Sequence, residues 1–192
     1  MFLYGIGEEK IMELTEKTLS SETIYEGRIV RLKVDQIELP NGNPASREVV
    51  NHPGGVTVVA LTDNNEILFV KQYRYPYGEI VLELPAGKLE KGFTPLENGK
   101  RELLEETGAI GYNYISLGAS YSSPGFCDET VHMYMCRIER FDEQRLDEDE
   151  FLNVVKIPVD RAVEMILNNR IFDGKTQTAV LKAAMLLKSG AI

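Results

Sequence analysis

Apolar and polar residues alternate with a period of two in the N-terminal part of the chain, and this alternation predicts β-strands. The pattern extends over residues 23–38, where we expect one strand. The turn signal PNGN follows at 40–43, and an extended run resumes at 47–51. The N-terminal part of the chain is therefore predicted to be an antiparallel β lobe.

A mixed series of strands and helices is predicted after the turn-rich segment HPGG at 52–55. Short apolar runs bounded by turn residues predict strands at 56–61, 66–73, 79–84, 112–121, 130–138 and 152–157. Amphipathic patterns predict helices at 159–169 and 175–188. A boundary at Gly54-Gly55 would divide the chain into an N-terminal β lobe, residues 1–54, and an α/β body, residues 55–192.

The strongest helix signal lies between these strands. Thr94 as N-cap, Pro95 at the first helical position and Glu97 at the third form a capping box. Gly108 is placed to end the helix in the left-handed conformation. We therefore expect a well-defined helix from Pro95 to the residue before Gly108.

Composition narrows the functional classes. The chain of 192 residues carries 30 acidic and 21 basic residues, a formal net charge of −9. This balance argues against nucleic acid as a partner, because binding to phosphates needs clustered Lys and Arg. The two Cys and two His match no zinc-binding spacing, whereas abundant carboxylates suit hard cations such as Mg²⁺ or Mn²⁺.

The sequence carries no signal for export or membrane insertion. Its first residues, MFLYGIGEEK, lack the basic segment and the long apolar run of a signal peptide. No stretch approaches the roughly 18 consecutive apolar residues of a transmembrane helix. We therefore expect a cytoplasmic protein with no membrane partner.

Three glutamates share one face of the capped helix. Glu102, Glu105 and Glu106 stand at positions i, i+3 and i+4. Carboxylates crowded in this way repel one another and acquire raised pKa values unless a cation offsets them. A solvated acidic helix face is the alternative. The turn LPAG at 84–87 favours a metal site, because its backbone carbonyls can complete an oxygen shell.

The helix and the turn before it resemble the signature of the Nudix hydrolases, in which a glycine precedes an Arg-Glu-x-x-Glu-Glu helix at a fixed distance. The matching residues are Gly87, Arg101, Glu102, Leu103, Glu105, Glu106 and Gly108. The resemblance implies the Nudix fold, an α/β/α sandwich around a mixed β-sheet. It also implies Mg²⁺, or Mn²⁺, held by the carbonyl of Ala86 with Glu102, Glu105 and Glu106, while Gly87 and Arg101 support the site.

Phe93 departs from the family signature, which has a glutamate at this position that braces the loop and helix through the arginine. Arg101 is therefore expected to lack its usual partner. Asn98 and Gly99 also lie inside the predicted helix, where a glycine costs about 1 kcal/mol relative to alanine. These features open the alternative of a catalytically weakened domain that binds a nucleotide as a sensor.

Further residues resemble the ADP-ribose pyrophosphatase branch of the family. That resemblance covers the chain from about Leu14 onward, so residues 1–11 are expected to be an extension. It implies a substrate-binding set of Arg74, Glu83, Ser123, Pro124, Gly125, Glu129 and Arg47. For Arg74 the alternative is an ordinary surface ion pair, and for Pro124-Gly125 it is a simple turn between strands.

The acidic segment DEDE at 147–150 resembles the mobile loop that supplies the catalytic base in this branch. Glu148 is the leading candidate for the base. Glu150 is the alternative base or an auxiliary metal ligand, and Glu105 assists.

The resemblance implies Mg²⁺-dependent hydrolysis of ADP-ribose, or a related nucleoside diphosphate sugar, to AMP and a sugar phosphate. It further implies a homodimer built with the N-terminal lobe, which also contributes substrate contacts. An isoprenoid diphosphate isomerase of the same fold would need a catalytic cysteine, and Cys127 has no histidine near it in sequence.

Overall fold

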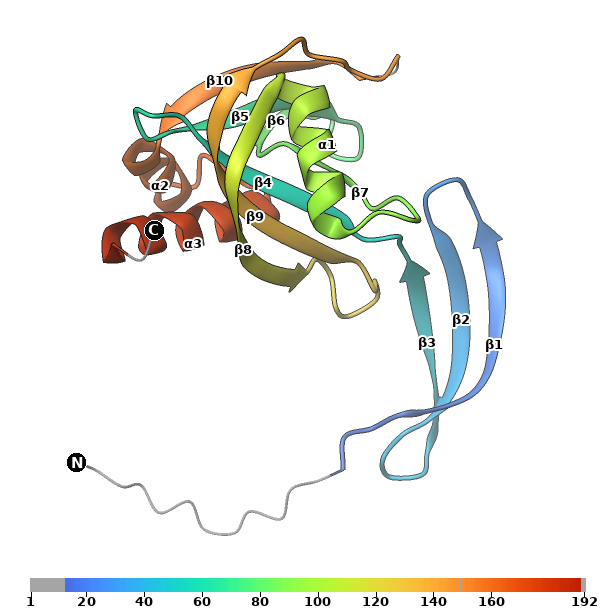
Figure 1. Cartoon of the computed structure of the whole chain (residues 1–192). Helices are drawn as coiled ribbons and strands as arrows, with labels where there is room; N and C mark the ends of the chain where they lie inside the picture. Colours follow the sequence, from blue (N-terminus) through green and yellow to red (C-terminus); the bar gives the residue numbers. More distant parts are fainter. Residues whose placement is uncertain (1–12, 149, 191–192) are drawn as a thin grey trace, which may run out of the picture. The chain divides into compact units, whose positions relative to one another are not determined.

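Three antiparallel strands form the sheet of the N-terminal unit, in the order β1-β2-β3 (Figure 1). They are β1 (Lys17–Glu26), β2 (Arg31–Glu38) and β3 (Pro44–Asn51). The expectation of one strand over 23–38 is wrong, because the chain turns where the N–H of Gly27 donates to the carbonyl oxygen of Val30 at 2.9 Å. Apolar residues continue to alternate across this turn, so their pattern could not mark the reversal.

Seven strands form the mixed sheet of the second unit. They are β4 (Gly55–Leu61), β5 (Glu66–Arg74), β6 (Glu79–Glu83), β7 (Ala86–Lys88), β8 (Ala109–Tyr121), β9 (Thr130–Phe141) and β10 (Leu152–Pro158). The order along the main path is β10-β5-β4-β9-β8, with β6 paired to β5 and β7 paired to β4. Only the pairing of β4 with β9 is parallel among the described strands. The strands expected from the sequence are therefore present in a mixed sheet, and β7 is an addition.

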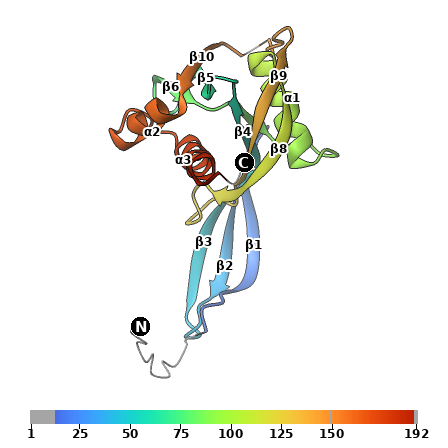
Figure 2. The ribbon, with the colours of Figure 1, turned by 60° about the vertical axis from the view of Figure 1, so that its left-hand side comes forward.

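Helices cover both faces of this sheet (Figure 2). They are α1 (Pro95–Thr107), α2 (Val159–Leu167) and α3 (Gly174–Ser189). Successive residues of β4 point to opposite faces: Val58 packs in a core cluster with Leu103 of α1, and Val59 packs in a cluster with Ala179 of α3. This arrangement confirms the predicted α/β/α sandwich.

The ends of α1 match the sequence prediction. The N–H of Glu97 donates to the Thr94 hydroxyl oxygen at 3.2 Å, and the Glu97 carboxylate accepts from the N–H of Thr94 at 2.7 Å. Gly108 ends the helix with a φ of 70° and donates its N–H to Leu104. The capping box and the left-handed glycine fix the register in which α1 presents its glutamates.

The turn before β7 is more ordered than the sequence suggested. The carbonyl oxygen of Pro85 accepts hydrogen bonds from the N–H of Val58 at 3.1 Å and from the Thr57 hydroxyl at 2.9 Å. Ala86 and Gly87 then pair with β4. The strand β7 therefore holds the Ala86–Gly87 backbone rigidly beside α1.

The structure, a computed structural model, describes residues 13–148 and 150–190. The chain divides into two compact units, residues 1–51 and 52–192. The boundary predicted from the sequence, between residues 54 and 55, lies three residues further along the chain. The predicted extension 1–11 lies outside the described residues. Every helix within the described ranges is too short or too polar to cross a lipid bilayer.

Candidate active site

Glu102 and Glu106 lie one turn apart on the face of α1 that packs against β7. Only 8% and 2% of their surfaces are exposed. The Glu106 carboxylate accepts the N–H of Ala86 at 2.9 Å. A Cβ atom on Gly87 would lie 2.0 Å from the Glu102 carboxylate carbon, so only glycine leaves room for this carboxylate. The fixed distance between Gly87 and the helix in the sequence therefore has a steric cause.

Both of these carboxyl groups hold protons more tightly than exposed glutamates do. Burial raises the pKa of Glu102 to about 7; Arg101 opposes this rise, while the charges of Glu105 and Glu150 add to it. Burial raises the pKa of Glu106 to about 8, against the hydrogen bond from Ala86, and the charges of Glu102, Glu150 and Glu83 add to the rise. A divalent cation would offset this repulsion.

The donor atoms fit a hard cation, because two buried carboxylates and a backbone strand meet at one place. Across residues 13–148 and 150–190, no three Asp, Glu, His or Cys side chains stand close enough to hold an ion together. Glu105, the third predicted ligand, is instead paired with Arg101 at 2.6 Å. Arg101 therefore engages one carboxylate oxygen each of Glu102 and Glu105.

Arg101 lacks the glutamate that the family signature has at position 93, and three other carboxylates surround it instead. Its guanidinium lies 2.7 Å from Glu102, 2.6 Å from Glu105 and 3.1 Å from Glu90. Glu90 belongs to the loop between β7 and α1 and was not singled out from the sequence. Phe93, the residue that replaces the expected glutamate, is 56% exposed.

Arg74 and Glu83 form a charge network that also acts on Glu106. Glu83, 1% exposed, accepts two hydrogen bonds from Arg74 at 2.7 and 2.9 Å. Lys175 donates to the same carboxylate at 2.6 Å and to Asp173 at 2.9 Å. Burial alone would lower the pKa of Arg74, but Glu83 raises it above its ordinary value. Lys175 is a functional candidate that the sequence missed; its nearest signal was Asp173, the N-cap of α3.

The alternative of an exposed surface ion pair for Arg74 does not describe this network, because its partner is fully buried. The two Glu83 oxygens are occupied by Arg74 and Lys175. The predicted contact of Glu83 with substrate stays a prediction, and its observed contacts fix Arg74.

The predicted substrate loop joins β8 to β9. The carbonyl oxygen of Ser123 accepts the N–H groups of Phe126 at 3.1 Å and Cys127 at 2.9 Å, which closes a turn with Pro124 and Gly125 exposed at its tip. Their contact with substrate stays a prediction.

Glu129 ends this loop beside the Gly87 backbone. A Cβ atom on Gly55 would lie 3.4 Å from the Gly87 carbonyl oxygen and 3.6 Å from the Glu129 carboxylate. Glu129 also lies 3.2 Å from Nδ1 of His52. The fold thus brings Glu129 toward the strand that packs against Glu102.

The two candidate bases differ in their surroundings. Glu150 is half-buried, and its charge raises the pKa of both Glu102 and Glu106. Glu148 is exposed. Residue 149 of the same acidic segment lies outside the described residues. The charge of Glu150 therefore acts on Glu102 and Glu106, and the choice between Glu148 and Glu150 as base stays a prediction.

Arg47 belongs to the N-terminal unit. Its guanidinium pairs with Glu16 of that unit, with Nε 3.0 Å from a carboxylate oxygen. The predicted contact of Arg47 with substrate stays a prediction.

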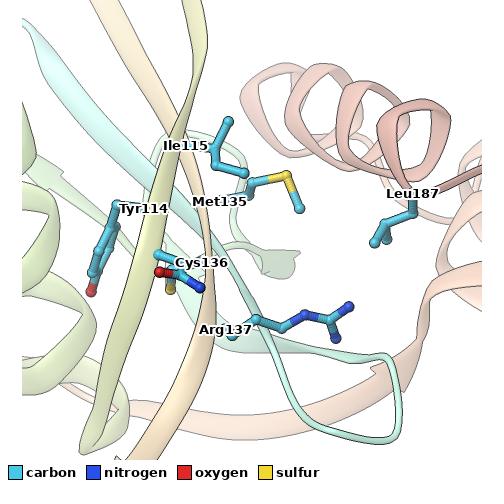
Figure 3. A pocket seen from close by; sticks show the side chains of 7 residues that line it. Tyr114, Ile115, Met135, Cys136, Arg137 and Leu187 are labelled. Carbon is cyan, nitrogen blue, oxygen red and sulfur yellow. The ribbon is translucent and has the colours of Figure 1, made fainter. Parts of the chain in front are cut away.

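A separate cavity of about 410 Å³ opens beside β8, β9 and α3 (Figure 3). Its lining residues are Asn113, Tyr114, Ile115, Met135, Cys136, Arg137 and Leu187. Burial raises the pKa of the Cys136 thiol to about 12, which disfavours the thiolate form at neutral pH. None of the predicted site residues lines this cavity, so it forms no part of the candidate active site.

Comparison with known proteins gives matches over both units. A family model described as the nucleoside diphosphate sugar hydrolase N-terminal domain matches residues 16–50, and the NUDIX domain model matches residues 51–177. The methanol dehydrogenase activator of Bacillus methanolicus is 45% identical over 167 residues, which cover 86% of this chain and 90% of that protein. The ADP-ribose pyrophosphatase of Bacillus subtilis (strain 168) is 43% identical over 169 residues, which cover 87% and 91%.

The fold also has a counterpart among solved structures. The crystal structure of an ADP compounds hydrolase superposes with a TM-score of 0.83 and covers 95% of this chain and 98% of its own. At 18% identity this likeness speaks for the fold alone.

Proposed function

The chain belongs to the Nudix family, and on that premise we propose that it hydrolyses the diphosphate of ADP-ribose, or of a related ADP-sugar, to AMP and a sugar phosphate. The observation that carries this proposal is the pair of buried carboxylates, Glu102 and Glu106, packed on the backbone at Gly87. The substrate class follows the ADP-ribose pyrophosphatase of B. subtilis.

In this proposal Glu102 and Glu106, with Glu105 and the Ala86 carbonyl, hold Mg²⁺ or Mn²⁺. When bound, such an ion offsets the charge of the diphosphate and lowers the pKa of water. Burial serves this role, because a desolvated carboxylate gains more from a cation than an exposed one does.

Three further residues act on the substrate and on water. Arg74, fixed by Glu83 through Nε and Nη2, retains Nη1 to donate to a phosphate oxygen. Glu150 accepts the proton of the attacking water, since it is the candidate base whose charge reaches both Glu102 and Glu106. Glu129 contacts the terminal ribose.

An assay of AMP release from ADP-ribose with Mg²⁺ tests the proposal. We expect turnover by the parent protein and a fall in kcat of at least about 100-fold in both Glu102→Gln and Glu150→Gln, the usual size of a lost ligand or general base. The matched variant Glu148→Gln removes a carboxylate from the same segment and should keep kcat within about threefold of the parent.

Circular dichroism and melting temperature establish that each variant is folded. Normal turnover by Glu102→Gln would contradict the role of Glu102 as a ligand of the catalytic cation. Loss of turnover in Glu148→Gln, with normal turnover in Glu150→Gln, would make Glu148 the base. The sensor alternative predicts a different result: ADP-ribose would raise the melting temperature without being hydrolysed.

The proposal includes a homodimer. Every residue of β1 is exposed, including Leu19, Ile24 and Tyr25, each more than half exposed. A three-stranded sheet gains stability when one of its faces is covered, and a second copy of the chain would provide that cover.

A further inference from the structure

We propose that Glu90 is a positioning residue that limits the hold of Arg101 on Glu102 and so keeps this carboxylate available to a cation. The inference rests on the proposed function in one respect, namely that Glu102 binds a divalent ion. It adds a residue of the loop between β7 and α1 to the site.

Glu90 and Glu102 contact the same nitrogen atom of Arg101. Nη2 of Arg101 lies 2.7 Å from the Glu102 carboxylate and 3.1 Å from the Glu90 carboxylate, so the two acids share it. Nη1 is engaged by Glu105 at 2.6 Å. If Glu90 lost its charge, Glu102 would be the sole anionic partner of Nη2, and a cation would have to displace a more tightly held guanidinium.

The position of Glu90 is fixed through its backbone. Its N–H donates to Oδ1 of Asn98 at 3.2 Å, and the Asn98 amide donates to the carbonyl oxygen of Thr94 at 3.0 Å. Asn98 is only 1% exposed. On the other side, the N–H of Leu89 donates to the carbonyl oxygen of Gly54 at 3.1 Å. The buried asparagine inside α1, which looks unfavourable for a helix, therefore holds the loop that presents Glu90.

Arg101 has room for another acceptor. Its Nε is buried and has no hydrogen-bond partner among the described residues. The contact with Glu90 therefore concerns Nη2 alone, the nitrogen that Glu90 shares with Glu102.

The experiment follows the melting temperature of the full chain against Mn²⁺ and Mg²⁺ concentration, without substrate. In Glu90→Gln we expect the half-maximal cation concentration to rise roughly twofold to fivefold, the range that a half-exposed charge pair supports. The matched control Glu139→Gln breaks another Arg–Glu pair of equal glutamate exposure, Glu139–Arg140, and should change nothing.

A second readout needs no cation. In metal-free protein Glu90→Gln should lower the melting temperature slightly, and the effect should vanish in an Arg101→Gln background, because the two residues act through one contact. An unchanged cation titration in Glu90→Gln would overturn the inference. If cations leave the melting temperature of the parent unchanged, the proposed function fails. If Glu90→Gln lowers the melting temperature of metal-free protein equally in the Arg101→Gln background, the inferred action of Glu90 through Arg101 is overturned.

Discussion

Glu102 and Glu106 link the stability of the protein to pH. Their pKa values in the folded chain, about 7 and about 8, lie above those of glutamates in an unfolded chain. At pH values between the pKa of an unfolded glutamate and these folded pKa values, the folded state binds more protons than the unfolded state. The free energy of unfolding contributed by these groups therefore falls as pH rises from about 4.5 to about 8.

We predict that the melting temperature of metal-free protein falls over this pH interval and that Mg²⁺ raises it more at pH 8 than at pH 6. The cation must displace protons at pH 6, whereas at pH 8 it offsets repulsion between charged carboxylates. Calorimetry of the parent and of Glu106→Gln, in matched ionic strength, measures both effects. The variant should show a weaker pH dependence; equal Mg²⁺ effects at both pH values would contradict the assignment.

Residues of the site differ in how far the sequence predicts them. Glu102 and Glu106 were predictable because helix periodicity places i and i+4 on one face, beside a glycine at a fixed distance. Glu90 was not, because its contact with Arg101 depends on the path of an irregular loop. Lys175 was not, because 92 residues separate it from Glu83 and only the packing of α3 brings them together.

At the scale of elements, the close approach of α1 to β4 explains a glycine that weakens the helix. A Cβ atom on Gly99 would lie 3.0 Å from Val56 and 3.2 Å from Val58. These valines are 1% exposed, so they would have to shift within the core to make room. The helix therefore lies directly on β4, which also pairs with β7 and so with the Gly87 backbone.

We predict that Gly99→Ala lowers the melting temperature. The gain of about 1 kcal/mol in helix propensity is outweighed by an overpacking cost of about 1–3 kcal/mol. Gly174→Ala is the matched control, because a Cβ atom there meets nothing within 4 Å and Gly174 begins α3. The melting temperature of Gly174→Ala should equal that of the parent or exceed it. A higher melting temperature of Gly99→Ala would contradict the prediction and show that the valines of β4 can move aside.

Most elements were predictable from their patterns, and the exceptions have particular causes. The ends of α1 followed from Thr94 and Gly108, whose conformations are local. The turn at Gly27 was not predicted, because the alternation of apolar and polar residues continues through it. The short strand β7 was not predicted, because Ala86 and Gly87 have low strand propensity. Their extended conformation comes from pairing with β4.

At the scale of the whole molecule, the exposed β1 predicts a dimer. We expect the parent to sediment as a homodimer and Ile24→Asp to shift toward monomer, because a charge would be buried at the contact. Leu167→Asp is the control: it adds the same charge at a residue 71% exposed at the end of α2. A parent that sediments as a monomer at all concentrations would refute the dimer.

The bond between Lys175 and Glu83 also determines when the site can be completed during synthesis. Arg74 and Glu83 leave the ribosome early, whereas the lysine that shares their buried carboxylate follows 92 residues after Glu83. Thr176, beside it, supplies the hydroxyl that accepts the N–H of Leu84. A nascent chain that ends before α3 therefore lacks two supports of the strand that leads into the site. The site therefore reaches its described form only after α3 has been made and has packed against the sheet.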